Sequence, residues 1–324
     1  PTWLVGVRRP AGVVMLLFVT RRIGTMLLTM VVVSILLFIL LELTPGNVAT
    51  KVLGPYSSEE QRRLWLEAHG YFDPLYVRYF RWLGDFIVGD FGQSTRFKTA
   101  VSDVLWPRLW NTAILGFAVM LVVVPLSLGL GVLAGMKEGS KLDRSISISA
   151  ILFTSIPEFA SAVFISAFFV FYLDLLPGTS GMVGGFSLQQ LVMPVLVLVL
   201  YDFGYIARMT RASMAEVMLS NYVRTAVLKG LPYRTVILKH ALRNALIAPF
   251  TVITLQINWL LSGVIVVESF FAYKGFGALL LEASLNQDIF LIEACAMVAV
   301  FVAVATQAAA DIGYTFLNPQ IRFS

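Results

Sequence analysis

Residues 23–43 read IGTMLLTMVVVSILLFILLEL, a run in which Glu42 is the single charged side chain. The hydrocarbon core of a bilayer is about 30 Å thick, and a helix crosses it with about 20 predominantly apolar residues. The run is long enough to do so, and the basic pair Arg21 and Arg22 precedes it. This stretch predicts a transmembrane helix and therefore an integral membrane protein.

The composition of the whole chain agrees with that class. Of its 324 residues, 58% are hydrophobic and 13% are charged, and the mean hydropathy is +0.82. A soluble domain has about 25% charged residues, so this chain has too little polar material to cover a water-exposed surface. The net charge of +5 is explained by Lys and Arg in cytoplasmic loops, and we expect lipid rather than nucleic acid as a partner.

Five further apolar runs are long enough to cross a bilayer. They lie at about residues 111–136, 146–173, 188–209, 246–267 and 289–317. With the first run they predict an all-α membrane protein with six transmembrane helices and both termini on the same side. The stretch 11–19 is too short to span and ends in Thr20, Arg21 and Arg22 rather than at a signal-peptide cleavage site. We expect a short surface helix there.

The basic residues orient these spans. Lys and Arg flank the first span, lie between the second and third and between the fourth and fifth, and end the chain; they are Arg8, Arg9, Arg21, Arg22, Lys137, Lys141, Arg144, the basic residues of 213–245, and Arg322. The positive-inside rule makes that side cytoplasmic. The expected division is a cytoplasmic segment 1–22, a first span 23–43, an external insert 44–96, a membrane core 97–317 with a cytoplasmic segment 213–245, and a cytoplasmic tail 318–324.

A basic segment interrupts the apolar spans. Residues 221–249 read NYVRTAVLKGLPYRTVILKHALRNALIAP and contain no acidic residue. Apolar residues recur at helical spacing, which predicts an apolar face of Leu219, Tyr222, Val223, Ala226 and Val227. Gly230 is placed to end this helix, and Pro232 to open a second helix over 233–242. The segment is either a loop that only fixes the orientation or a docking surface for a cytoplasmic protein. Orientation does not require an ordered amphipathic hairpin, so docking is favoured.

The same segment resembles the coupling segment of inner-membrane permeases of ABC importers, in the dipeptide and oligopeptide branch. The importer signature Glu-Ala-Ala, three residues and Gly falls on Arg224, Thr225, Ala226 and Gly230, with Arg in place of Glu. The resemblance implies a type I importer fold in which this helix fits a groove on an ATPase subunit. It implies coupling roles for Tyr222, Val223, Arg224, Thr225, Ala226, Lys229 and Gly230.

Further motifs follow in the order of that family. They are LTPGN (43–47), DPLYVRYFRWLGDFIVGDFGQS (73–94), SIP (155–157), VIVVESFFAYKGFG (264–277) and DIGYTFLNPQIR (311–322), in which Asn47, Asn318 and Gln320 depart from the usual pattern. The long insert after the first span is similar to one of the two permease subunits of such importers. The resemblance implies as partners a second, homologous permease, two ATPase subunits and an extracytoplasmic solute-binding protein, in a bacterial inner membrane.

The sequence gives no indication of an enzyme. It contains no Gly-x-x-x-x-Gly-Lys-[Ser/Thr] phosphate loop, only two histidines and the single cysteine Cys295. We therefore expect no metal site, disulfide or cofactor in this chain, and we expect ATP and Mg²⁺ to be bound by the partner ATPases.

Ionisable side chains within the spans are the candidates for a translocation path, because burying them in a membrane is costly. Glu158, after Pro157 in the third span, and Asp202 in the fourth could meet a cationic group of a substrate, or could serve structure by pairing with nearby polar groups. Glu268 and Phe271 could form an external gate or a simple re-entrant turn. Pro157, which frees a backbone carbonyl, is assigned a structural role.

Asp311, on one face with Gln307 and Tyr314, is also assigned a structural role, as the partner of an Arg of the basic segment. Gly131 and Gly135 form a small-xxx-small face that predicts close helix packing.

The chain is therefore predicted to be the permease subunit of an ATP-driven importer that works by alternating access. The resemblance favours di- or oligopeptides as the substrate, and nickel complexes, oligosaccharides and opines stay open. The alternatives are an ion-coupled secondary transporter that uses Asp202 and Glu158, and a membrane scaffold or exporter subunit. Secondary transporters usually carry inverted repeats or paired broken helices, and neither is evident in the sequence.

Overall fold

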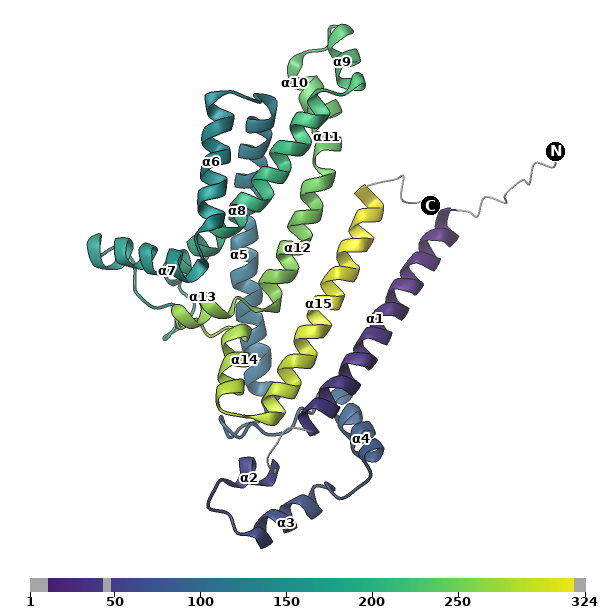
Figure 1. The fold of residues 1–324 in the computed structure, drawn as a ribbon, viewed down its shortest axis with the longest axis vertical. Helices are drawn as coiled ribbons and strands as arrows, with labels where there is room; N and C mark the ends of the chain where they lie inside the picture. Colours follow the sequence, from purple (N-terminus) through teal and green to yellow (C-terminus); the bar gives the residue numbers. More distant parts are fainter. Residues whose placement is uncertain (1–10, 43–47, 318–324) are drawn as a thin grey trace, which may run out of the picture.

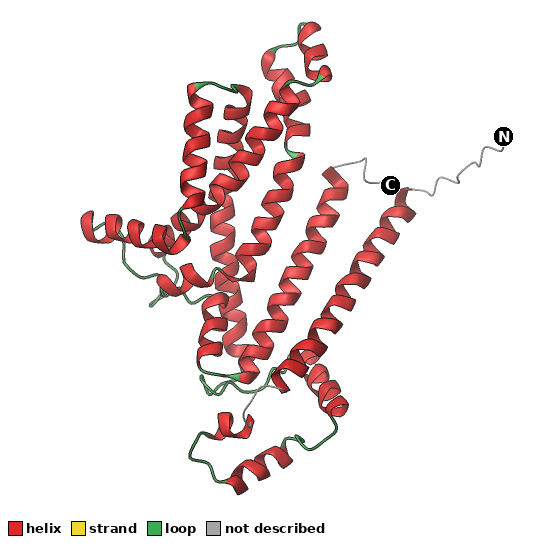
Figure 2. Ribbon diagram, in the orientation of Figure 1, coloured by secondary structure: helices red, strands yellow, loops and turns green. Residues whose placement is uncertain are grey.

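The computed structural model describes residues 11–42 and 48–317, and within them every regular element is a helix (Figures 1 and 2). The helices are α1 Ala11–Glu42, α2 Val48–Leu53, α3 Glu59–Ala68, α4 Leu75–Val88, α5 Val101–Met136, α6 Lys141–Ser155, α7 Glu158–Ser166, η1 Ala167–Tyr172, α8 Leu188–Met218, α9 Asn221–Leu228, α10 Tyr233–Thr235, η2 Val236–Ala241, α11 Leu242–Ala245, α12 Ile247–Gly263, α13 Ile265–Phe270, α14 Phe276–Leu285 and α15 Ile289–Leu317. The motif LTPGN, the segment 1–10 and the tail 318–324 lie outside the described residues.

Four helices are long and apolar enough to cross a membrane, and the number rises to six if two bent helix pairs each count as one span. Figure 1 shows a bundle with α9–α11 at one end and α2–α4 at the opposite end. We call these the hairpin end and the insert end. The predicted all-α architecture is confirmed, but several predicted boundaries are wrong.

The N-terminal surface helix is one of these errors. Helix α1 runs without a break from Ala11 through Arg21 and Arg22 to Glu42. It contains no proline, and the glycine nearest to the two arginines, Gly24, is tolerated within a helix. The helix lies at the edge of the bundle, where it packs mainly on α15 and touches α4 (Figure 1).

Helices α5 and α8 form the most extensive contact of the fold. Gly131 and Gly135 lie against α8 so closely that a Cβ atom added to Gly131 would sit 2.6 Å from Thr210 Cβ, and one added to Gly135 would sit 2.6 Å from the Arg211 carbonyl. The predicted small-residue packing face is confirmed. Around this contact, buried side chains of α5, α6, α7, α8, α12 and α13 form the main apolar core.

The predicted third span is bent instead of straight. Helices α6 and α7 meet at an angle of 100°, and Figure 1 shows α7 pointing sideways out of the bundle. The ring of Pro157 restricts the preceding residue to extended backbone, and Ile156 has φ −86° and ψ 122°. Pro157 therefore breaks the helix that was predicted to run continuously through residues 146–173.

The predicted fifth span also ends early. Helix α12 ends at Gly263, the short α13 follows, and α14 leads on to the insert end, where α15 begins (Figure 1). The segment 233–245 precedes α12 at a bend of 50°. Helix α8 continues past the predicted end of the fourth span to Met218, and α5 starts at Val101 rather than near Asn111.

The insert end carries three short helices. Ser58 caps α3 in a capping box, accepting a hydrogen bond from Gln61 N at 3.2 Å while Gln61 Oε1 accepts from Ser58 N at 2.9 Å. Helix α4 ends at Gly89 in left-handed conformation. Fully buried Asp288, which precedes α15, accepts from Ser94 Oγ at 2.5 Å and so attaches the end of the insert to the membrane core.

Candidate functional site

The hairpin end is built as a helix, a glycine turn and a second helix. Helix α9 ends at Leu228 with Lys229 as its C-cap, and Gly230 turns the chain with φ +73°, a conformation that glycine adopts without strain. Pro232 then precedes the helical run α10–η2–α11. The predicted hairpin is confirmed as local structure.

One side of α9 is fixed to the rest of the protein. Val223 and Ala226 are buried and pack with a small apolar core contributed by α8 and η2, which includes Met214, Val236 and Ile237. This packing attaches the hairpin to the end of α8.

The other side of α9 is open. Tyr222, Arg224, Thr225 and Lys229 are exposed, as is Gly230 at the turn. The predicted apolar face is divided between two environments, because Val223 and Ala226 are buried whereas Leu219, Tyr222 and Val227 are exposed. They lie outside the narrow stripe that contacts η2, and Leu228 beside them is 80% exposed. The result is a mixed basic and apolar surface that no other described part of the chain covers.

A second fixed point at the hairpin end was missed by the sequence analysis. Buried Asp143, in the first turn of α6, accepts two hydrogen bonds from Arg211 of α8, from Nε at 2.9 Å and from Nη2 at 2.8 Å. It also accepts from Gly139 N at 2.9 Å. The bidentate geometry is the strong form of an ion pair, and it ties the α5–α6 turn to α8 near the hairpin. Charge signs alone could not find this pairing across 68 residues.

Among the predicted path residues, Asp202 is the one in the fourth span. It is fully buried on α8, where its Oδ1 accepts a hydrogen bond from Gln256 Nε2 of α12 at 2.5 Å. Its Oδ2 has no hydrogen-bond partner among the described residues. Glu158, half-buried, begins α7, and α7 packs against α8. The two predicted carboxylates therefore lie on neighbouring helices.

An aromatic cluster of α8 and α12 begins at Tyr201, which precedes Asp202 in the chain. The ring of Tyr201 stacks on Trp259 of α12 at 5.3 Å and meets Tyr205 edge-on at 5.8 Å. Arg208 follows on α8, 5.6 Å from the centroid of the Tyr205 ring. The i, i+4, i+7 spacing of Tyr201, Tyr205 and Arg208 was the signal in the sequence that could have identified this face.

Glu268 and Phe271 do not line an open path in this conformation, since both are fully buried. Glu268 Oε1 accepts from Thr112 Oγ1 at 2.5 Å, and Oε2 accepts from Ala278 N at 2.9 Å. A Cβ atom on Gly275 would collide with this carboxylate. Glu268 therefore joins the α13–α14 turn to α5, and a gating role for it stays a prediction.

The predicted partner of Asp311 is wrong. Asp311 forms an ion pair with Arg22 of α1 and accepts a hydrogen bond from Gln307 Nε2 at 3.1 Å. Helix α15 packs against α1, which brings Arg22 to Asp311 in place of an Arg of the basic segment. The interaction joins two helices, as expected for a structural residue.

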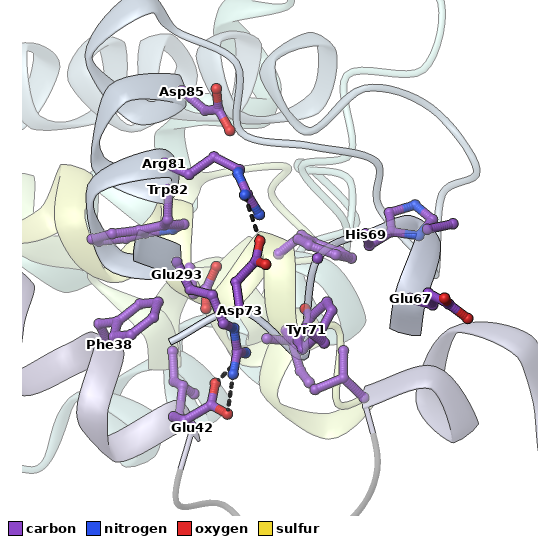
Figure 3. Close-up of a pocket in the computed structure, with 17 residues that line it drawn as sticks. Phe38, Glu42, Glu67, His69, Tyr71, Asp73, Arg81, Trp82, Asp85 and Glu293 are labelled. Carbon is purple, nitrogen blue, oxygen red and sulfur yellow. Dashed lines mark hydrogen bonds and ion pairs between the residues drawn. The ribbon is translucent and has the colours of Figure 1, made fainter. Parts of the chain in front are cut away.

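A polar cavity of about 580 Å³ lies at the insert end, between α1, α4 and α15. Figure 3 shows Glu42 held by two ion-pair contacts and Asp73 paired with Arg81, with Glu293 and Trp82 on the wall behind them. The arginine on Glu42 is Arg78, at 2.7 and 2.5 Å, and it also lies 4.4 Å from the centroid of the Tyr71 ring. Burial, together with the nearby Glu293 carboxylate, raises the pKa of Tyr71 to about 12. These contacts fasten the insert to the membrane helices.

Metal chemistry finds no support in the described ranges 11–42 and 48–317, where no group of three or more His, Cys, Asp or Glu side chains could hold an ion. Cys295 is buried on α15 among apolar side chains. That position fits a small apolar filler.

The chain matches two protein families along its length. Residues 127–323 match the binding-protein-dependent transport system inner membrane component, and residues 15–113 match the N-terminal part of such membrane components. It is 31% identical to the oligopeptide transport system permease protein AppB of Bacillus subtilis, over 90% of this chain and 94% of that protein. It is 32% identical to the glutathione transport system permease protein GsiC of Shigella flexneri, over 95% and 100% of the two chains.

A solved structure shares the fold. The chain aligns with the inward-facing MetNI methionine ABC transporter with a TM-score of 0.50 and 18% identity, over 67% of this chain and 96% of that one. At this identity the likeness concerns the fold alone.

Proposed function

This chain belongs to the family of inner-membrane components of binding-protein-dependent transport systems, and we propose that it forms half of the translocation path of a peptide importer whose ATPase subunits dock on α9. It is a multi-pass permease subunit of an ABC transporter. The relatives that it matches give no support to an ion-coupled mechanism. ATP and Mg²⁺ would be bound by the partner subunits.

The open side of α9 is the observation that carries this proposal. Tyr222, Arg224 and Lys229 project from a helix whose opposite side is anchored by Val223 and Ala226. A soluble face needs charge, but it does not need exposed tyrosine and leucine beside that charge. Aromatic, arginine and apolar side chains together are typical of a protein interface. An ATPase that closes on this surface would pull on α8 through the anchored side.

The orientation follows from the same assignment. The hairpin end would face the cytoplasm with both termini, and the insert end would face the solute-binding protein outside a bacterial inner membrane. A second, homologous permease would complete the path, and two ATPases would bind the two hairpins. Closure of the ATPases would move the spans between outward-open and inward-open arrangements.

Peptides are the proposed substrate class. The relatives are named for oligopeptides and for the tripeptide glutathione, and they match this chain over nearly its full length. Selection among peptides would rest mainly with the binding protein.

The test is purification of the tagged chain in mild detergent, after expression with its natural neighbours, followed by mass spectrometry. We expect a second membrane permease and ATPases with phosphate-loop motifs. Arg224→Glu should lower the recovered ATPase at least about tenfold, because it reverses one charge at the centre of the docking surface. Arg63→Glu on α3, equally exposed at the opposite end, is the matched control. Recovery of the chain without ATPases, or equal recovery with both variants, would refute the docking role.

A further inference from the structure

The carboxylate of Asp202 is incompletely satisfied in the centre of the helix bundle. Its Oδ1 accepts from Gln256, while Oδ2 is buried and lacks a hydrogen-bond partner within the described residues. A buried polar group left unpaired costs free energy, and a buried charge costs more. A position of this kind within a transmembrane helix indicates a ligand or a moving part.

No side chain of the described ranges supplies the missing positive charge. Neither Asp202 nor Glu158 takes part in any of the ion pairs formed by residues 11–42 and 48–317. Arg208 lies nearly two helical turns further along α8, where its Nε donates to the Gly204 carbonyl at 3.0 Å. The described residues therefore leave both carboxylates without an ion-pair partner.

The surroundings suit an organic cation. Tyr201, adjacent to Asp202 on α8, stacks on Trp259, which lies three residues after the Asp202 partner Gln256 on α12, and Tyr205 next to them is partly exposed. Aromatic faces attract ammonium and guanidinium groups through their quadrupole, and the attraction grows where water is excluded. Glu158 is half-buried and forms the outer member of the pair, whereas fully buried Asp202 forms the inner one.

We propose that Asp202 and Glu158, with the rings of Tyr201 and Trp259, form a cation subsite for a primary ammonium group of the transported solute. The amino terminus of a peptide carries such a group, so the inference rests on the proposed function for its source. The subsite itself depends only on the charge and geometry around Asp202. A solute with an ammonium group would therefore pass faster than a neutral solute of the same size.

The first test measures binding to the full chain in lipid nanodiscs. The probes are alaninamide, which carries an ammonium group, and N-acetylalaninamide, which is neutral. We expect alaninamide to raise the unfolding temperature of the wild type more than the neutral probe does. Asp202→Asn, which keeps the shape, should remove that difference, and Asp202→Glu should restore part of it. Asp174→Asn, an exposed aspartate after η1 with φ +50°, is the matched control and should behave as the wild type.

The second test measures uptake by the complete transporter with its binding protein. Rates for trialanine and for N-acetyltrialanine are each divided by the wild-type rate for the same peptide. Asp202→Asn should lower the trialanine ratio about tenfold or more, since a neutral amide binds an ammonium group less strongly than a carboxylate does. The acetylated peptide should be little affected.

The outcomes separate the subsite from the transport assignment. Equal stabilisation by both probes in the wild type, or an unchanged difference in Asp202→Asn, would overturn the subsite whatever the chain transports. If Asp202→Asn lowered the uptake of both peptides equally, and the two probes stabilised the wild type equally, Asp202 would have a structural role alone. A clear binding difference in a chain that recruits no ATPase would uphold the subsite and overturn the proposed function.

Discussion

Substitution of Gly131 by alanine tests the packing of α5 on α8. The new Cβ atom would lie 2.6 Å from Thr210 Cβ and 2.7 Å from the Ala207 carbonyl oxygen, whereas ordinary contact begins at 3.4 Å. The helices must therefore separate by up to about 0.8 Å, and overpacking of this kind costs about 1–3 kcal/mol. Alanine itself favours a helix over glycine by about 0.5–1 kcal/mol. We expect a net loss of about 1 kcal/mol in the free energy of unfolding.

Gly129 is the matched control, because it lies two residues away on the same helix and a Cβ atom there would meet nothing within 4 Å. Gly129→Ala should keep or slightly raise stability, so the two variants should differ by the overpacking cost alone, about 1–3 kcal/mol. The assay is unfolding in mixed micelles titrated with a denaturing detergent, followed by circular dichroism. Equal stability of the two variants would show that α5 and α8 do not approach as closely as described.

Two further substitutions test local contacts. Glu268→Gln places an amide donor against Thr112 or the α14 backbone, and should lower the free energy of unfolding by about 1–3 kcal/mol. Glu282→Gln on α14, whose ion pairs are long and partly exposed, should change that free energy by less than about 1 kcal/mol. A larger effect of Glu282→Gln would contradict the role of Glu268 in joining the α13–α14 turn to α5. Tyr71 has a pKa of about 12 in the folded chain against about 10 in an unfolded one. The folded state then binds the extra proton, so this group makes stability fall as the pH rises from about 10 to about 12. Tyr71→Phe should flatten that fall in alkaline unfolding experiments while replacement of the exposed Tyr76 should not, and an unchanged pH slope in Tyr71→Phe would exclude the burial of Tyr71.

The parts of the fold that depend on apolar length alone could be predicted from the sequence. Helix α15 has the predicted bounds 289–317, and residues 23–42 of the first predicted span lie within α1. The hairpin was predictable too, because glycine and proline mark its turn at Gly230 and Pro232. These signals are local, and each acts through the conformation of a few adjacent residues.

The bend at Pro157 and the partner of Asp311 were not predictable in the same way. Proline is tolerated inside transmembrane helices when neighbouring helices satisfy the freed backbone groups, so its presence does not decide between a kink and a break. Asp311 could have paired with any arginine near that end of the bundle, and helix packing decided for Arg22. Long-range packing also brings Gln256 to Asp202 and Trp259 to Tyr201. The composition of the two helices does not indicate these contacts.

Helix α8 places two of these features on one straight element. Asp202 and Met218 are 16 residues apart without an intervening proline, which corresponds to about 24 Å along a helix axis. Such a helix moves as a nearly rigid body, since it resists compression and bending over this length. A tilt of about 5° at the hairpin would displace the carboxylate of Asp202 by about 2 Å, enough to break its hydrogen bond to Gln256. ATPase closure at the hairpin would then change the affinity of the Asp202 subsite for a cation through the tilt of one helix.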